Sequence, residues 1–135
     1  MARRRARAPS GDDMAKIAIV DDSRLARTFT ATVLRRLGHE VEEIDPASIF
    51  EVVRMLKEVG PDLLVMDFLM PNCPGMSLAR VCREEAALAG MRILVITAHH
   101  DEEVATRLTQ MGVAGILYKP VEAAGLAEQV GELLG

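Results

Sequence analysis

Residues 63–71 read Leu-Leu-Val-Met-Asp-Phe-Leu-Met-Pro, and this stretch decides the fold. Four apolar residues run directly into an acid, Asp67, and a proline follows at position 71. An unbroken apolar run is typical of a strand that is buried on both faces, as in a parallel sheet. Ligands of open α/β sheets bind at the edge where such strands end, so Asp67 is predicted to offer its carboxylate there.

Similar apolar runs alternate with amphipathic segments along the whole chain. The predicted strands are Lys16–Val20, His39–Ile44, Asp62–Met66, Met91–Ile96 and Val113–Tyr118. A predicted helix follows each strand: from Ser23 to Gly38, from Asp45-Pro46 to Gly60, from Met76 to Ala89, from Asp101 to Gly112, and Val121–Leu134. Strands that alternate with helices predict an α/β fold with a parallel sheet and helices on both faces.

Two of these elements carry more detailed predictions. The first helix has an apolar stripe that recurs every four residues and is predicted to face the core: Leu25, Phe29, Val33 and Leu37. The strand at 39–44 mixes Val41 and Ile44 with three acidic residues, which suits an edge strand better than a central one.

Composition limits the possible functions. The length of 135 residues suits one domain, predicted at 14–135. Residues 1–13 are rich in arginine and are predicted to be a disordered extension or a non-native start. Without them, 12 basic and 18 acidic residues remain, and such an acidic body is a poor nucleic-acid binder. No apolar run approaches a membrane span, and two cysteines without a metal-ligand pattern favour a reducing cytoplasm.

Polar residues converge at one edge of the predicted sheet, because right-handed crossovers bring the strand ends that precede helices together. The residues at those ends are Asp21, Asp22, Asp67, Thr97 and Lys119. Three carboxylates held close repel each other, and one lysine cannot neutralise them. Mg²⁺ can, and it prefers a few carboxylates together with water and phosphate oxygens. The edge is therefore predicted to be a Mg²⁺ site for phosphoryl transfer, with Asp67 as the nucleophile.

Short motifs around these residues occur in a characteristic order. They are the acidic pair 21–22, the segment Asp-Phe-Leu-Met-Pro at 67–71 with Gly75 four residues beyond it, Thr97, and Lys119-Pro120. Each motif is weak alone, but together, on these strand ends, they are highly specific. From about Met14 to Gly135 the chain resembles a stand-alone response-regulator receiver domain of bacterial two-component signalling. The resemblance implies a flavodoxin-like (βα)5 fold with strand order 2-1-3-4-5, which places the strand at 39–44 at an edge.

The resemblance also implies roles for individual residues. Asp67 is the expected phosphoacceptor and a metal ligand. Asp22 is the expected direct Mg²⁺ ligand, Asp21 reaches the metal mostly through water, and the backbone carbonyl of Leu69 is a further ligand. Lys119 pairs with the phosphate, and its bond to the following proline is usually cis in this family.

The expected switch departs from the family pattern. Thr97 matches the hydroxyl that moves toward the phosphate, but Ile116 stands where the family often has an aromatic residue. The single tyrosine, Tyr118, is adjacent to the lysine instead, so another side chain has to carry the signal outward. Leu69 and His99 flank the phosphate site. Leu69 has no group that orients an attacking water, and His99 either orients one or is merely exposed.

The function that the resemblance implies is phosphoacceptor signalling, in which the chain catalyses only its own phosphorylation and dephosphorylation. A sensor histidine kinase or a phosphotransfer protein donates the phosphate to Asp67, and the surface of the fourth helix, fifth strand and fifth helix changes. That surface then binds a downstream protein target, or the phosphate is handed on in a phosphorelay. Many members of the family also dimerise through the fourth and fifth helices when phosphorylated.

Other functions remain open beside this one. A small Mg²⁺-dependent aspartyl-phosphate phosphatase needs a second acid two residues after Asp67, where this chain has Leu69. A receiver-like binding module that does not use phosphate is a second alternative. A flavodoxin-like electron carrier needs a phosphate-binding loop after the first strand, where the acidic pair at 21–22 would repel the FMN phosphate.

Overall fold

The computed structural model describes residues 14–135, so the prediction for residues 1–13 lies outside the described residues. The strands are β1 (Lys16–Val20), β2 (Glu40–Ile44), β3 (Leu63–Asp67), β4 (Arg92–Thr97) and β5 (Gly115–Tyr118). The helices are α1 (Arg24–Arg36), α2 (Ile49–Val59), α3 (Gly75–Glu84), α4 (Glu102–Gln110) and α5 (Ala123–Leu134), with a short 3-10 helix, η2 (Ala86–Leu88), after α3. None of the helices within 14–135 combines the length and apolar character that a membrane span requires.

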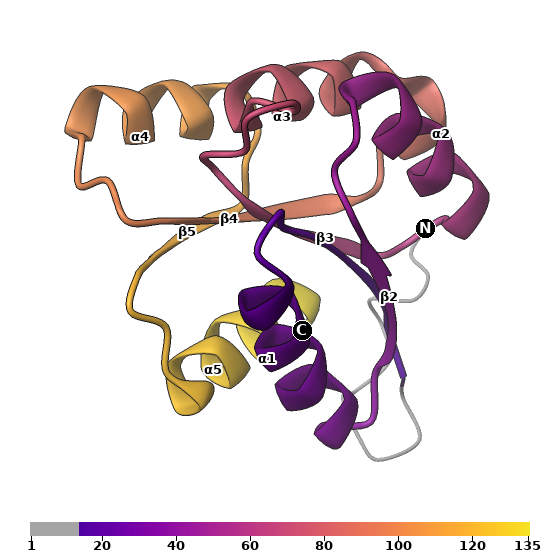
Figure 1. Cartoon of the computed structure of the whole chain (residues 1–135), viewed down its shortest axis with the longest axis vertical. Coiled ribbons are helices and arrows are strands. Elements are labelled where there is room, and N and C mark those ends of the chain that lie inside the picture. Colours follow the sequence, from indigo (N-terminus) through magenta and orange to yellow (C-terminus); the bar gives the residue numbers. More distant parts are fainter. Residues whose placement is uncertain (1–13) are drawn as a thin grey trace.

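The strands form one parallel sheet in the order β2-β1-β3-β4-β5. This order confirms the predicted flavodoxin-like topology and the edge position of β2. Figure 1 shows α2, α3 and α4 on one side of the sheet and α1 and α5 on the other. β3 therefore lies at the centre of the sheet, with a helical layer above and below it.

Two apolar cores fill the spaces between the sheet and these layers. Side chains of successive strand residues point to opposite faces, so Leu64 and Met66 of β3 enter one core and Leu63 and Val65 the other. The first core is closed by α2, α3 and α4, and the second by α1 and α5. Burial on both faces is the physical reason why the strand sequences are continuously apolar.

The apolar stripe predicted for α1 is confirmed at Val33, which packs against the second core, and is wrong at the other three positions. Leu25 is 81% exposed and Leu37 48% exposed, whereas the buried positions of this helix are Thr30, Ala31 and Leu34. A helix has 3.6 residues per turn, so a strict four-residue repeat drifts by about 40° at each step and leaves the buried face. The exposed apolar side chains at the start of α1 consequently belong to the surface.

Several element boundaries also differ from the predictions. α2 begins at Ile49 rather than at 45–46, because the Ser48 hydroxyl caps it by accepting the Glu51 backbone N–H at 3.1 Å. α3 ends at Glu84, and its predicted last turn is the separate helix η2. β5 begins at Gly115 rather than at 113. None of these differences changes the layers or moves a strand end away from the site edge.

Candidate functional site

Three buried polar side chains mark the carboxyl edge of the sheet. Asp21 directly follows β1, Asp67 is the last residue of β3, and Thr97 is the last residue of β4. Each is less than a tenth exposed, and they are three of only four buried polar or charged residues in the described part of the chain. Lys119, directly after β5, completes the group from the neighbouring strand. The parallel topology is what brings these four residues, far apart in sequence, to one place.

A carboxylate cluster forms the centre of this edge. One carboxylate oxygen each from Asp21, Asp22 and Asp67 lies within 4.8 Å of the others. Asp21 is held by the Ser23 backbone N–H, which donates to its Oδ1 at 2.9 Å. Burial raises the pKa of Asp21, and the negative charges of Asp67 and Asp22 raise it further. The cluster thus carries more negative charge than its surroundings balance.

The donor set suits a hard divalent cation. The three carboxylates supply oxygen ligands only, and Asp22 is exposed, which leaves one side of the cluster open to solvent. Mg²⁺ typically binds through a few carboxylates while it keeps waters and takes phosphate oxygens. Asp21, Asp22 and Asp67 are therefore the residues that could hold Mg²⁺ here, and a bound cation would offset the repulsion that raises the pKa of Asp21.

Lys119 is the cation nearest to the central carboxylate. Its Nζ lies 3.0 Å from Oδ1 of Asp67, and the Lys119 side chain is 36% exposed against 8% for Asp67. The Lys119 backbone N–H donates to the Thr97 carbonyl at 2.9 Å, which extends the β4–β5 pairing to the site. The Lys119–Pro120 peptide bond is cis. The lysine is thus anchored by its backbone while its ammonium group points at the phosphoacceptor candidate.

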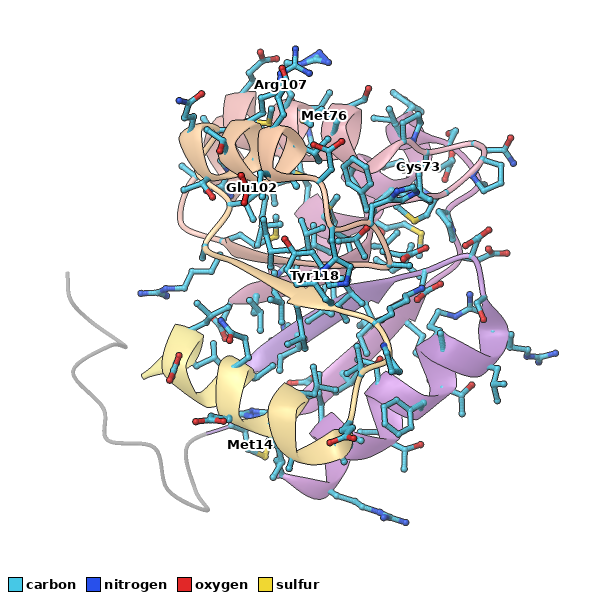
Figure 2. The ribbon with its side chains drawn as sticks, turned by 90° about the vertical axis from the view of Figure 1, so that its left-hand side faces the viewer. Met14, Cys73, Met76, Glu102, Arg107 and Tyr118 are labelled. Atoms are coloured by element: carbon cyan, nitrogen blue, oxygen red, sulfur yellow. The ribbon has the colours of Figure 1, made fainter. Side chains whose placement is uncertain are left out.

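Thr97 and the loop after it show how a hydroxyl connects the site to α4. The Thr97 Oγ1 accepts the His99 backbone N–H at 3.0 Å, at the start of the loop that leads to the α4 cap, Asp101. Tyr118 pairs with Thr97 across the strands, and its ring stacks on His100 with centroids 4.3 Å apart and an interplanar angle of 15°. Figure 2 shows Tyr118 between α4 on one side and α5 on the other.

The residues predicted to flank the site are both accessible. Leu69 is 55% exposed in the loop after β3, and His99 is exposed in the loop after β4. Ile116, at the position where an aromatic residue was expected, is half-buried and packs against the α2–α3–α4 core. It has no polar group that could follow a movement of Thr97.

Sequence reasoning missed two features of the site. Arg27 of α1 donates from Nη1 to the Asp21 backbone carbonyl at 2.6 Å, so it braces the loop that carries the acidic pair. Leu25 and Phe29 line a surface pocket of about 460 Å³ together with Lys119, Pro120 and Val121. No spacing signals either feature, because both depend on how α1 is rotated against the sheet. Only the apolar character of Leu25 and Phe29 was visible, and it indicated the core.

Comparison with known proteins places this geometry in a family. Residues 17–131 match the model of the response regulator receiver domain. The chain is 34% identical over 119 residues to chemotaxis protein CheY-3 of Vibrio cholerae, an alignment that covers 87% of this chain and 90% of the relative. It is also 34% identical to the positive alginate biosynthesis regulatory protein of Pseudomonas aeruginosa, over 83% of this chain and 44% of that protein.

A solved structure supports the same family assignment. The chemotaxis response regulator CheY4 of Vibrio cholerae superposes with a TM-score of 0.81 at 26% identity, covering 89% of this chain and 98% of the other. The acidic edge, the central aspartate and the lysine at 3.0 Å thus occur on the expected fold. Proteins of this kind act in two-component signalling rather than as classical enzymes, and this chain belongs to the response regulator receiver domain family.

Proposed function

We propose that the chain is a phosphoacceptor that takes a phosphoryl group on Asp67 from a histidine kinase or a phosphotransfer protein. One observation carries this proposal: Asp67 is buried, lies within 4.8 Å of two further carboxylates, and contacts Lys119 at 3.0 Å. A carboxylate between a cation site and an ammonium group is placed for attack on phosphorus. The proposed metal ligands are Asp21, Asp22, Asp67 and the backbone carbonyl of Leu69.

Asp67, Lys119 and Thr97 have different roles in the proposed transfer. An oxygen of Asp67 attacks the phosphorus of a phosphohistidine, the P–N bond breaks, and its electron pair stays on the donor imidazole. Lys119 holds Asp67 before the transfer and pairs with a phosphoryl oxygen after it. Thr97 exchanges its bond to the His99 N–H for a bond to the phosphoryl group. Bound Mg²⁺ would supply positive charge for the phosphoryl oxygens and for the acidic cluster.

The surface beside the site supports a protein donor. Leu25 is 81% exposed and Phe29 40% exposed, and both line the pocket with Pro120, Val121 and the site lysine. Exposed apolar groups that gather in one place mark interaction sites. A histidine-bearing helix seated on this patch would present its imidazole to Asp67, which lies next to the patch through Lys119.

Once phosphorylated, the chain acts either as a switch or as a relay. In the switch, the α4–β5–α5 surface changes and binds a protein target or a second copy of the chain. In the relay, the phosphate passes to a histidine protein. A target whose affinity does not depend on phosphorylation would contradict the switch, and failure to return phosphate to any histidine carrier would contradict the relay.

We place these exchanges in the cytoplasm, where free thiols such as Cys73 and Cys82 persist.

The test is the intact mass of the protein after incubation with acetyl phosphate and Mg²⁺. Wild type is expected to gain one phosphoryl adduct, and Asp67→Asn is expected to gain none. Asp45→Asn is the matched control, because Asp45 follows β2 at the same edge and is exposed. It should be phosphorylated like wild type. An adduct that persists in Asp67→Asn, or a folded wild type that gains none with Mg²⁺, would overturn the proposal.

A further inference from the structure

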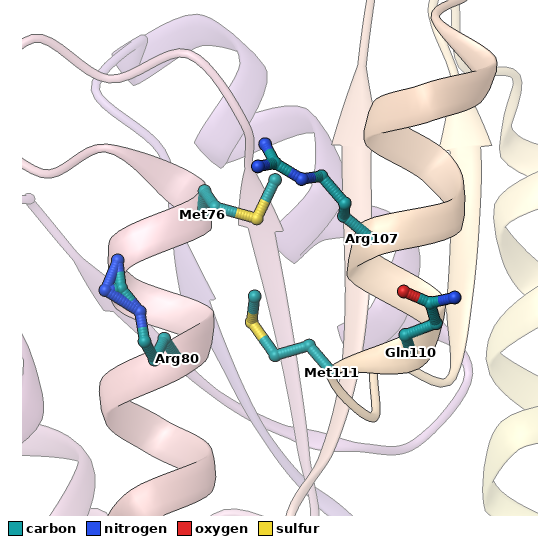
Figure 3. Close-up of a pocket in the computed structure, with 5 residues that line it drawn as sticks. All are labelled: Met76, Arg80, Arg107, Gln110 and Met111. Carbon is teal, nitrogen blue, oxygen red and sulfur yellow. The ribbon is translucent and has the colours of Figure 1, made fainter.

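A groove runs between α3 and α4, away from the acidic edge and from the pocket beside α1. It is lined by Met76 and Arg80 of α3, Arg107 and Gln110 of α4, and Met111 directly after α4, and its volume is about 480 Å³. Figure 3 shows the two methionine side chains in the gap, with Arg107 reaching from α4 toward Met76 and Arg80 standing on α3. Figure 2 likewise shows Met76 and Arg107 close together. The floor is thus apolar and the rim is basic.

In the part of the chain that the structure describes, the two rim arginines are unpaired. Among residues 14–135, neither Arg80 nor Arg107 forms an ion pair or a hydrogen bond. The groove between α2 and α3 differs, because its two cations are already neutralised. There Arg54 pairs with two glutamates of its own helix, and Lys57 Nζ lies 3.1 Å from Glu85. Free positive charge beside an apolar floor therefore distinguishes the α3–α4 groove.

The position of the groove connects it to the site. α3 begins at Gly75, whose N–H donates to the Phe68 carbonyl at 3.0 Å, one residue after Asp67. α4 is capped by Asp101, four residues after Thr97. The two walls of the groove thus start from the two loops that leave the phosphoacceptor and the switch hydroxyl. A ligand in the groove would contact both of these helices at once.

We propose that the α3–α4 groove binds an acidic, amphipathic segment of a partner protein. An apolar side chain of the segment packs on Met76 and Met111, whose unbranched side chains adapt to different shapes. Carboxylates on its two sides pair with Arg80 and Arg107 through charge-assisted hydrogen bonds. The docking does not need phosphorylation, so it goes beyond the phosphoacceptor function. The two proposals can be tested independently.

The affinity test uses a fluorescein-labelled helical peptide that carries leucines on one face and glutamates beside them. Fluorescence anisotropy is measured without acetyl phosphate, for wild type, Arg80→Glu, Arg107→Glu and the control Arg36→Glu. Arg36 is exposed in the last turn of α1 and, in the described part of the chain, is likewise unpaired. Each groove reversal is expected to weaken binding about fivefold, the upper range for an exposed ion pair, and the double variant about 25-fold. Arg36→Glu should bind like wild type.

The position test uses methyl-labelled methionine in NMR. The chain has 8 methionines, and the peptide is expected to shift the methyl signals of Met76 and Met111 while the exposed Met14 stays in place. A peptide with serines for leucines and one with lysines for glutamates should bind at least tenfold more weakly. Equal weakening by Arg36→Glu, unchanged binding in both groove variants, shifts elsewhere, or capture by anionic lipid vesicles instead of the peptide would each overturn the proposal.

Discussion

Replacement of Gly75 by alanine is expected to strain the protein at the point where α3 leaves the site. A Cβ at this position would stand 2.7 Å from the Phe68 carbonyl oxygen and 2.9 Å from the Phe68 Cα. Both are backbone atoms, so no flexible side chain can turn away. Gly75 does not have a positive φ, and the residue is therefore required for space rather than for conformational freedom. The added methyl group has to push α3 away from residue 68, next to Asp67.

The magnitude follows from the cost of overpacking. Inserted methyl groups in well-packed regions destabilise by about 1–3 kcal/mol, and the backbone contacts favour the upper half of this range. About 2 kcal/mol corresponds to a Tm lower by roughly 8 °C for a domain of this size. The matched control is Gly131→Ala in α5, where a Cβ meets nothing within 4 Å. Alanine in a helix interior is expected to stabilise there by about 0.5–1 kcal/mol.

Gly75→Ala is thus expected to lower the free energy of unfolding and Gly131→Ala to raise it. Urea denaturation and thermal melts of the two variants measure both changes. Phosphorylation by acetyl phosphate should also be slower in Gly75→Ala, because the loop that carries Leu69 has moved, and unchanged in Gly131→Ala. A Gly75→Ala protein that melts at or above the wild-type temperature would refute the reasoning, because the contact with residue 68 would then cost nothing.

Three further expectations concern the metal site, a histidine and the cysteines. Mg²⁺ at a hundredfold excess over its Kd should stabilise the protein by about 2.7 kcal/mol relative to EDTA, and Asp22→Asn should remove most of that gain in thermal melts; an equal gain in both proteins would contradict the cluster as the binding site. Burial lowers the pKa of His39, whose Nδ1 accepts the Ala15 N–H at 3.3 Å. As the pH falls, His39 of the unfolded chain therefore takes up a proton near pH 6.5, before His39 of the folded protein does. The stability that this provides is therefore full above pH 6.5 and declines as the pH falls toward the folded pKa, and urea denaturation across this range should show a flatter profile for His39→Asn. Burial raises the pKa of Cys82 to about 12 and also raises the pKa of Cys73, so a chromogenic disulfide reagent should react with both thiols only in denaturant; rapid reaction in native buffer would contradict their burial.

The helical layers around a parallel sheet were accessible from the sequence because burial on both faces leaves a strong pattern, whereas the strand order came from the resemblance to a known family. The strands between the two edges, β1, β3 and β4, are built around apolar runs, and the acidic β2 lies at one edge. The rotation of α1 was not accessible. Leu25 and Phe29 lie on the surface beside the site. A pattern of apolar residues does not say whether they face a core or a partner.

The α3–α4 groove could not be predicted from the sequence either. Met76 and Met111 are 35 residues apart in the sequence, and no periodicity joins them. Both side chains line one groove because the parallel topology sets α3 beside α4, and within residues 14–135 neither Arg80 nor Arg107 forms an ion pair. The spacing of glutamates and arginines in a helix permits ion pairs, as it does for Arg54, but the side-chain conformations that make or break them are not contained in a linear pattern.

By itself, the sequence determined the succession of strands and helices along the chain and which polar residues stand at the strand ends, because each of these follows from local patterns and from the handedness of crossovers. Only the tertiary structure decided that three carboxylates lie within 4.8 Å, that Lys119 contacts Asp67 at 3.0 Å, and that Arg27 braces Asp21. It also decided which face of α1 is exposed. These features depend on distances between separate elements, and the packing of helices on a twisted sheet sets such distances.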